Sequence, residues 1–425
     1  MSKRPVLLSR KFLGFLILSG ALALSGMTPA EAAAKKHRTH TVHKKAAVPK
    51  HAAHRKSSRK VAKAKRVKSQ PVVIVTKAPN DAPDFDFQPR IREAQELAAR
   101  APVLPGDMVV EGGNLVRFNW VLVVGQKTGP LTVLRMDEKG NNSQGFIVTW
   151  QVNNYLNTKF TVESTGAPGT PAIGSTAGNI IVFAQRRPVR AKGGWEEAVY
   201  TAYAPELDTR KMRDAGLDYL RTLEHLAYNR VNSHDVRSRT APDKTVAERI
   251  PRNMVLRLMI TEHVDPLRMK YVGIEQCVHE VLITIAANRD KAYAYARSSA
   301  GALGLPQFME SSYHMVRDNY PSARLEPNFD LGMTNLHNAV LASLLLLDLE
   351  LTELPRAALK QVTESSHHFA AFLAAGYNRN PAKVAKTFQR TKSMTGGPVP
   401  FENKMYVRIQ GWVGGFLERE YRLPG

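Results

Sequence analysis

One short stretch of the chain combines small residues, glycines and a single amide side chain. It runs from Ser298 to Met309 with the sequence SSAGALGLPQFM. Glycine lets a backbone adopt positive φ or approach another group closely, and one amide beside a tight loop can orient a ligand in a concave site. Gln307 is therefore a candidate binding residue. The alternative is a helix-capping loop that holds no ligand.

A glutamate at the end of an apolar run is the candidate for acid–base chemistry. Glu262 follows the run Met254–Ile260, MVLRLMI, and Val264-Asp265-Pro266 after it indicates the end of a helix. An apolar wall raises the pKa of a carboxyl group, which then holds a proton at neutral pH and can donate it as a general acid. The alternative is a solvated charge at a helix end.

Four segments, in this order, resemble the soluble lytic transglycosylases, a family with the goose-type-lysozyme-like fold. They are the residues around Glu262, the stretch from Ser298, Ala374–Asn378 and Pro400–Val407. The family reads E-S-x-F-x-P, S-x-x-G-A-x-G-L-M-Q-x-M, A-Y-N-A-G and E-T-R-x-Y-V. The resemblance spans residues 245–420. It implies a peptidoglycan lytic transglycosylase that acts on glycan strands and needs no metal and no cofactor.

The resemblance also implies a mechanism with a single carboxylate. Glu262 would protonate the MurNAc–GlcNAc β-1,4 glycosidic oxygen, and the acetamido group of the substrate would stabilise the cationic centre. The same residue would then take the proton of the muramoyl 6-hydroxyl, which closes on C1 to give a 1,6-anhydro product. Most glycosidases use two carboxylates instead.

Other residues that match the family motifs are implied to bind the glycan. They are Ser298, Gly301, Gln307, Met309, Tyr377, Asn378 and Glu402. The family places the tyrosine hydroxyl near the glutamate and the acetamido group, which gives this role to Tyr377. The alternatives are a structural cap for Asn378, a structural ion pair for Glu402 and a core position for Met309.

The chain departs from the family pattern at several positions. His263 stands where the family has serine, Pro306 where it has methionine, and Gly376 where it has the alanine before the tyrosine. The largest departure is the spacing from the glutamate to the serine motif, which is much longer here. We therefore expect Leu267–Arg297 to be an inserted helical segment, and Glu280 within it is a rival for the catalytic acid.

The positive charge of the chain is concentrated near its N-terminus. Of a net charge of +23, residues 34–70 contribute fourteen lysines and arginines and no acidic residue. Residues 1–32 have the basic start, apolar stretch and Ala-x-Ala end of a signal peptide, which predicts export to the periplasm or cell envelope. Residues 33–70 are predicted to be a disordered tether that contacts an anionic envelope polymer or a membrane surface.

Two further regions follow a linker over residues 71–102 that ends in a short helix, Ile91–Arg100. Residues 103–200 contain β-branched and aromatic runs between Gly, Asn and Pro turns, which predicts a small antiparallel β-rich domain. Residues 201–425 show helical periodicity. The fold class is therefore α+β, multidomain, with an all-α lysozyme-like domain at the C-terminus. Leu341–Leu347 is apolar on all sides and is expected to be buried.

The expected elements can be given by residue range. The strands are Leu115–Val124, Leu131–Arg135, Phe146–Val152, Lys159–Glu163 and Ile180–Ala184, and the helices are Arg213–Arg230, Arg252–Glu262, Cys277–Ala287, Asn335–Leu351, His367–Ala375 and Met405–Arg419.

The cysteine content and the charge distribution argue against two function classes, a cysteine nucleophile and a specific nucleic-acid-binding protein. The lone cysteine, Cys277, lies in an apolar run and is interpreted as a buried small side chain rather than a nucleophile. Specific nucleic-acid binding is disfavoured because the folded part carries little of the net charge. Two alternatives to the transglycosylase remain. One is a hydrolytic muramidase on the same fold, and the other is a non-catalytic peptidoglycan-binding envelope protein.

Overall fold

The chain is described by a computed structural model over residues 84–151, 159–164, 180–191, 193–395 and 399–423. The predicted signal peptide, the tether, residues 71–83 of the linker and the turn at 165–174 lie outside the described residues. Within the described ranges, none of the helices has the combined length and apolar character that crossing a membrane requires.

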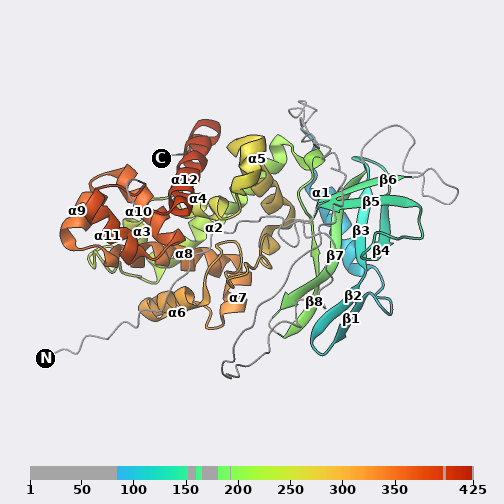
Figure 1. Cartoon of the computed structure of the whole chain (residues 1–425), viewed down its shortest axis with the longest axis horizontal. Coiled ribbons are helices and arrows are strands. Elements are labelled where there is room, and N and C mark those ends of the chain that lie inside the picture. Colours follow the sequence, from blue (N-terminus) through green and yellow to red (C-terminus); the bar gives the residue numbers. More distant parts are fainter. Residues whose placement is uncertain (1–83, 152–158, 165–179, 192, 396–398, 424–425) are drawn as a thin grey trace, which may run out of the picture. The chain divides into compact units, whose positions relative to one another are not determined.

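Small antiparallel sheets form the first part of the described chain, as the sequence predicts (Figure 1). Strands β4-β3-β7-β8 form one sheet, and the hairpins β1-β2 and β5-β6 pair separately. The strands are β1 (Met108–Glu111), β2 (Asn114–Phe118), β3 (Trp120–Gly125), β4 (Leu131–Met136), β5 (Phe146–Gln151), β6 (Lys159–Ser164), β7 (Ile181–Ala191) and β8 (Gly194–Tyr200).

The central sheet is longer than the sequence predicts. All residues of β3 are buried, which fits its apolar sequence WVLVVG and its place between β4 and β7. β7 extends to Ala191, well beyond the predicted end at Ala184, and β1 and β8 were not predicted. The predicted strand ended too early because an arginine usually indicates an exposed position. Arg186 is instead buried within β7, where its guanidinium donates to the carbonyl oxygens of Ala98 and Ala101.

The second part of the described chain is helical, again as predicted. The helices are α1 (Gln88–Arg100), α2 (Arg210–Ser233), α3 (Val246–Arg249), α4 (Met254–Thr261), α5 (Pro266–Asn288), α6 (Glu310–Asn319), α7 (Phe329–Thr334), α8 (Leu336–Glu350), α9 (Arg356–Thr363), α10 (Ser366–Asn378), α11 (Pro381–Thr391) and α12 (Phe401–Tyr421), of which α1 precedes the strands. The short helices α3, α6, α7, α9 and α11 were not predicted.

Helix α8 is the buried centre that its sequence predicts. Leu341–Leu347 is buried throughout, and α8 packs against α2, α4 and α10. Helix α12 in turn packs against α4 and α10. These helices therefore bring together residues that are far apart in the sequence, and they position the candidate site.

Helix α5 covers most of the predicted inserted helical segment Leu267–Arg297, and its second half belongs to the core. Asp265 caps its first turn by accepting the backbone N–H of Leu267 at 2.8 Å, and Pro266 occupies the first helical position. At Gly273 the backbone leaves the helical region, with φ 80° and ψ 168°, so α5 consists of two helical halves. The second half is buried against the sheet and α1 on one side and against the other helices on the other.

Helix α2 crosses α5 with backbone against backbone. A Cβ atom on Gly216 would lie 2.0 Å from the carbonyl oxygen of Leu282, so only glycine permits this approach. Helix α1, which the sequence places in the linker, contributes Ile91, Ala94 and Ala98 to the core that the sheet shares with α5.

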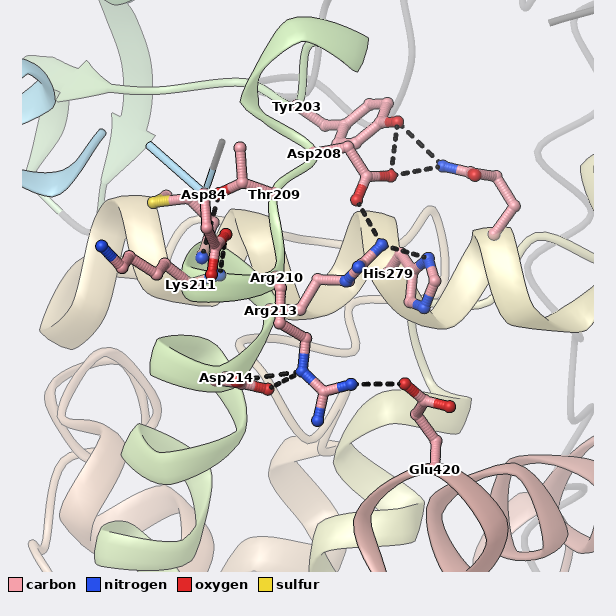
Figure 2. Close-up of polar contacts among 12 residues, drawn as sticks. Asp84, Tyr203, Asp208, Thr209, Arg210, Lys211, Arg213, Asp214, His279 and Glu420 are labelled. Carbon is pink, nitrogen blue, oxygen red and sulfur yellow. Dashed lines mark hydrogen bonds and ion pairs between the residues drawn. The ribbon is translucent and has the colours of Figure 1, made fainter. Parts of the chain in front are cut away.

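Polar contacts fix the start of α2 to its neighbours (Figure 2). Thr209 caps the helix, and Asp208 accepts hydrogen bonds from Arg213 and from Gln276 of α5. Arg210 pairs with Glu420 in the last turn of α12 at 2.6 Å. The end of α12 is thereby tied to α2, and α12 is the helix that supplies a tyrosine to the candidate site.

Candidate active site

Glu262 lies at the end of α4 and contacts a tyrosine from α12. Every residue of α4 is buried, and Glu262, the residue after it, is partly exposed. The start of α4 is held by Glu224, which accepts the backbone N–H of Asn253 at 2.8 Å. Tyr406 donates its hydroxyl to Oε1 of Glu262 at 2.5 Å. The buried helix α4 thus places the carboxyl group of Glu262 at the boundary between the protein core and the surface.

The surroundings of Glu262 favour its protonated form. Burial raises the pKa of this carboxyl to about 8, whereas the hydrogen bond from Tyr406 acts in the opposite direction, because a donated hydrogen bond stabilises the charged form. Glu262 therefore holds a proton at neutral pH. The Tyr406 hydroxyl can stabilise the carboxylate that remains after the proton is transferred. A residue with these two properties can act as an acid and then as a base.

Tyr377 links the Ser298–Met309 loop to the buried helix α8. Its hydroxyl donates to the carbonyl oxygen of Pro306 at 2.8 Å, and it lies 3.4 Å from Oγ of Ser343. Burial raises the pKa of Tyr377 well above its usual value, and the nearby Glu262 carboxyl raises it further. The structure therefore brings Tyr377 into the electrostatic neighbourhood of Glu262 and leaves it a neutral hydroxyl.

His263 joins the turn after α4 to the same loop. Its ring stacks on Tyr293, with centroids 3.6 Å apart, and Nε2 donates to the carbonyl oxygen of Leu305 at 2.9 Å. Burial lowers the pKa of His263 to about 3, so the ring is neutral at physiological pH. At this departure from the family pattern, an imidazole holds the loop beside Glu262.

The Ser298–Met309 loop is held together by its own polar groups. Gln307 adopts a φ of 48°, and its side-chain amide donates to the carbonyl oxygens of Ala296 and Gly304 at 3.0 and 2.8 Å. Gly304 has a φ of +80°, and a Cβ there would lie 2.7 Å from the carbonyl oxygen of Met333. The structure thus assigns Gln307 a loop-holding role, whether or not its amide also contacts a ligand.

The other candidate binding residues form no hydrogen bond or ion pair with Glu262. Ser298 accepts the backbone N–H of Ala302 at 3.0 Å, and Gly301, with a φ of +93°, forms the turn between them. Met309 is the residue before α6. Asn378 donates to Oδ1 of Asn403 at 3.2 Å, which ties α10 to α12.

Glu402 is exposed in the first turn of α12. Its carboxylate forms no ion pair within the described ranges. The structure therefore does not support the alternative that Glu402 belongs to a structural ion pair.

The rival acid Glu280 is occupied by two cations. Arg268, in the first half of α5, donates Nε to both carboxylate oxygens at 2.8 Å, and Lys159 of β6 lies 3.5 Å away. Both carboxylate oxygens are thus engaged by a residue on the other side of the Gly273 break. Glu280 therefore holds the two halves of α5 together.

Tyr406 is the residue of this site that sequence reasoning missed. The signal was present, because Tyr406 stands at the tyrosine of the E-T-R-x-Y-V motif. His263 was recognised only as a departure from the motif. Its stacking partner Tyr293 has no counterpart in the family motifs, so no sequence signal pointed to it.

We expect the substitution Tyr406→Phe to weaken the acid–base function of Glu262 without unfolding the protein. Removing the hydroxyl deletes the one hydrogen bond that lowers the pKa of Glu262, so this pKa should rise above about 8. The carboxylate would lose a stabilising donor, a loss of about 1.5–3 kcal/mol for a hydrogen bond to a charged group. For a reaction in which Glu262 supplies the proton, the pH–rate profile should show a lower maximum and an alkaline limit at higher pH.

Tyr421→Phe is the matched control for this prediction. Tyr421 is on the same helix, and its buried hydroxyl has no hydrogen-bond partner among the described residues. Its profile should coincide with that of the unchanged chain. An unchanged profile for Tyr406→Phe would show that the hydroxyl does not act on Glu262.

Comparisons with family models, with curated proteins and with solved structures found no match to this chain. In the part of the chain that the structure describes, no group of three His, Cys, Asp or Glu side chains is arranged to hold a metal ion. Cys277 is buried, and burial raises the pKa of its thiol to about 12, which confirms the interpretation of this residue as a small core side chain.

Proposed function

We propose that the chain is an exported peptidoglycan lytic transglycosylase whose helical region has a goose-type-lysozyme-like fold. The observation that carries the proposal is the environment of Glu262, a carboxyl with a pKa of about 8 that accepts a hydrogen bond from Tyr406. A glycan-cleaving acid needs its proton at neutral pH, and burial is the usual way in which a protein provides this.

In the proposed reaction, Glu262 donates its proton to the glycosidic oxygen as the bond from this oxygen to C1 breaks. The carbonyl oxygen of the substrate's acetamido group attacks C1 and takes up the positive charge. The Glu262 carboxylate, stabilised by Tyr406, then removes the proton of the 6-hydroxyl. This oxygen bonds to C1 and displaces the acetamido oxygen, and the product is a 1,6-anhydro sugar.

The proposed substrate-binding residues are the loop Ser298–Met309, with Tyr377, Asn378 and Glu402. Tyr377 supports this assignment because it contacts the loop and also lies in the field of Glu262. The basic segment over residues 33–70 would bring the enzyme to anionic polymers or lipids of the envelope through long-range attraction that salt weakens.

Mass spectrometry of the soluble products from peptidoglycan sacculi tests the proposal. The full chain should release muropeptides that end in anhydro-muramic acid, and Glu262→Gln should release none. Glu280→Gln is the matched control, because its carboxylate is held in an ion pair, and it should still release anhydro products. Reducing ends would instead identify a hydrolytic muramidase.

Two other outcomes would contradict the assignment. Equal product release by the unchanged chain and by Glu262→Gln would remove Glu262 as the acid. Binding of the chain to sacculi with no product from any variant would indicate a non-catalytic peptidoglycan-binding protein.

A further inference from the structure

A second glutamate, buried in the core, interacts electrostatically with the tyrosines of the candidate site. Glu350 is the last residue of α8, and only 2% of it is exposed. Its Oε2 atom is buried and has no hydrogen-bond partner among the described residues. Buried polar atoms are almost always hydrogen-bonded, so a carboxyl oxygen left without a partner needs an explanation.

The backbone of α10 makes room for Glu350. A Cβ atom on Gly376 would lie 2.6 Å from Oε2 and 3.0 Å from Cδ of Glu350. The carboxyl group therefore occupies the space that any larger residue at position 376 would need. This explains why glycine stands before Tyr377, where the family pattern has alanine. Gly376 and Glu350 are a matched pair in this chain.

Glu350 also shares its surroundings with the tyrosines near Glu262. Tyr377 and Tyr406 each interact electrostatically with Glu262 and with Glu350. Ser343, which lies 3.4 Å from the Tyr377 hydroxyl, precedes Glu350 by two helical turns on the same face of α8. The two tyrosines thus interact both with an acid at the edge of the core and with an acid within it.

We propose that Glu350 is a positioning residue of this site, an uncharged carboxylic acid that fills the space opposite Gly376 and supports the two tyrosines near Glu262. Its effect on glycan cleavage rests on the proposed function. Its uncharged state and its packing do not.

Among the described residues, no cation that would balance a negative charge contributes to the electrostatics of Glu350. The titratable groups that interact with it are Tyr377 from α10 and Tyr406 from α12, both neutral, and Pro381 from α11 packs against the same glycine. Burial raises the pKa of Glu350 well above its usual value. A charged Glu350 would also oppose the carboxylate form of Glu262, which the base step requires.

The packing part of the proposal is tested by a double-mutant cycle on the full chain. Gly376→Ala and Glu350→Ala should each lower the folding equilibrium constant, the first by a clash and the second by leaving a cavity. The double variant should be about tenfold or more better folded than the product of the two single effects predicts, because the new methyl group enters the vacated space. Strictly additive effects would overturn the shared-space argument.

The uncharged state is tested by the pH dependence of folding. A folded-state pKa above the unfolded value contributes stability below the unfolded pKa, and this is lost as the pH rises through the folded pKa. Relative to Glu350→Gln, the folding constant of the unchanged chain should fall by up to about tenfold per pH unit above the unfolded pKa. Glu353→Gln, an exposed neighbour, should follow the unchanged chain. Parallel curves for the unchanged chain and Glu350→Gln would overturn the proposal.

The positioning role is tested by steady-state kinetics. Glu350→Gln should keep kcat and the alkaline limit of the rate, because glutamine preserves shape and neutrality. Glu350→Ala should lower kcat by about tenfold with little change in KM, and move the alkaline limit, because the tyrosines lose their support. If Glu350→Ala left kcat and the alkaline limit of the rate unchanged, Glu350 would have a structural role only, and the positioning role would be overturned. Absence of cleavage by the unchanged chain would remove the proposed function, and the two folding tests would still stand.

Discussion

Glu262→Gln is expected to lower the rate of glycan cleavage by about 10²- to 10⁴-fold, the usual contribution of a general acid. Glutamine has the shape of the protonated acid but cannot give up a proton. The hydroxyl of Tyr406, which donates to Glu262 Oε1, can still donate to the amide oxygen, so the fold should persist. The measurement is the initial rate of anhydro-muropeptide release.

The pH dependence of the unchanged chain sharpens this prediction. Because the pKa of Glu262 is about 8, the fraction of protonated acid and the rate should fall about tenfold per pH unit above this value. The proton also contributes to folding. Its contribution is complete below the unfolded pKa and is lost as the pH rises towards about 8. Glu262→Gln should therefore lose less stability than the unchanged chain as the pH rises from 4.5 to 8.

Glu364→Gln provides the control for both measurements. Glu364 also ends a helix, but its side chain is exposed and lies 3.7 Å from Lys360. Its replacement should change neither the rate nor the pH dependence of folding. A Glu262→Gln variant with the rate of this control would exclude Glu262 as the acid.

Asp348→Ala is expected to lower the free energy of unfolding by about 3–5 kcal/mol, which is a large part of the net stability of a folded domain. The carboxylate is fully buried and accepts hydrogen bonds from Ser238 Oγ at 2.6 Å, the backbone N–H of Arg239 at 2.8 Å and the hydroxyl of Tyr320 at 2.7 Å. Alanine would leave the buried hydroxyls of Ser238 and Tyr320 without this acceptor, and the partly buried N–H of Arg239 would lose it as well. Denaturant titration measures the loss.

Two further variants give the scale for this prediction. Tyr320→Phe removes only one donor and should cost about 1–3 kcal/mol. Asp214→Ala breaks an exposed pair with Arg210, in which 42% of the aspartate side chain is exposed, and should cost no more than about 1 kcal/mol. A cost for Asp348→Ala as small as that for Asp214→Ala would mean that the three donors find other acceptors.

The sequence predicts those features of the site that depend on local pattern. The apolar run of α4 fixes a buried helix, and Glu262 follows it directly, so the position of the candidate acid could be predicted. The order of the motifs also pointed to Tyr377 and to the loop, and the structure joins these through Pro306. The apolar sequence of α8 likewise predicted its burial.

Contacts between distant elements could not be predicted in the same way. Tyr406 reaches Glu262 across 144 residues, and its hydroxyl is placed by the packing of α12 on α4. Glu350 ends an apolar helix, where an acid is usually solvated, and only the approach of Gly376 shows why it is buried. Arg186 hid the length of β7 because its hydrogen-bond acceptors come from other parts of the chain.

One local signal has two meanings, and only one of them entered the prediction. Asp265-Pro266 indicates the end of a helix, although aspartate followed by proline also begins one. The structure has both, since α4 ends and α5 begins within a few residues. The segment that was expected to be an insertion therefore contains a core helix, and the acid lies at a junction between two core elements.

The close crossing of α2 and α5 limits how this region can move. Helices separated by side chains can slide when rotamers change, but no side chain separates Gly216 from Leu282. Sliding of α2 along the second half of α5 would therefore have to separate the two backbones at this point. Gly273 has open space around its Cβ position and a non-helical backbone. Arg268 and Glu280 form an ion pair across this break, so a rotation of the first half of α5 about Gly273 would have to break that pair.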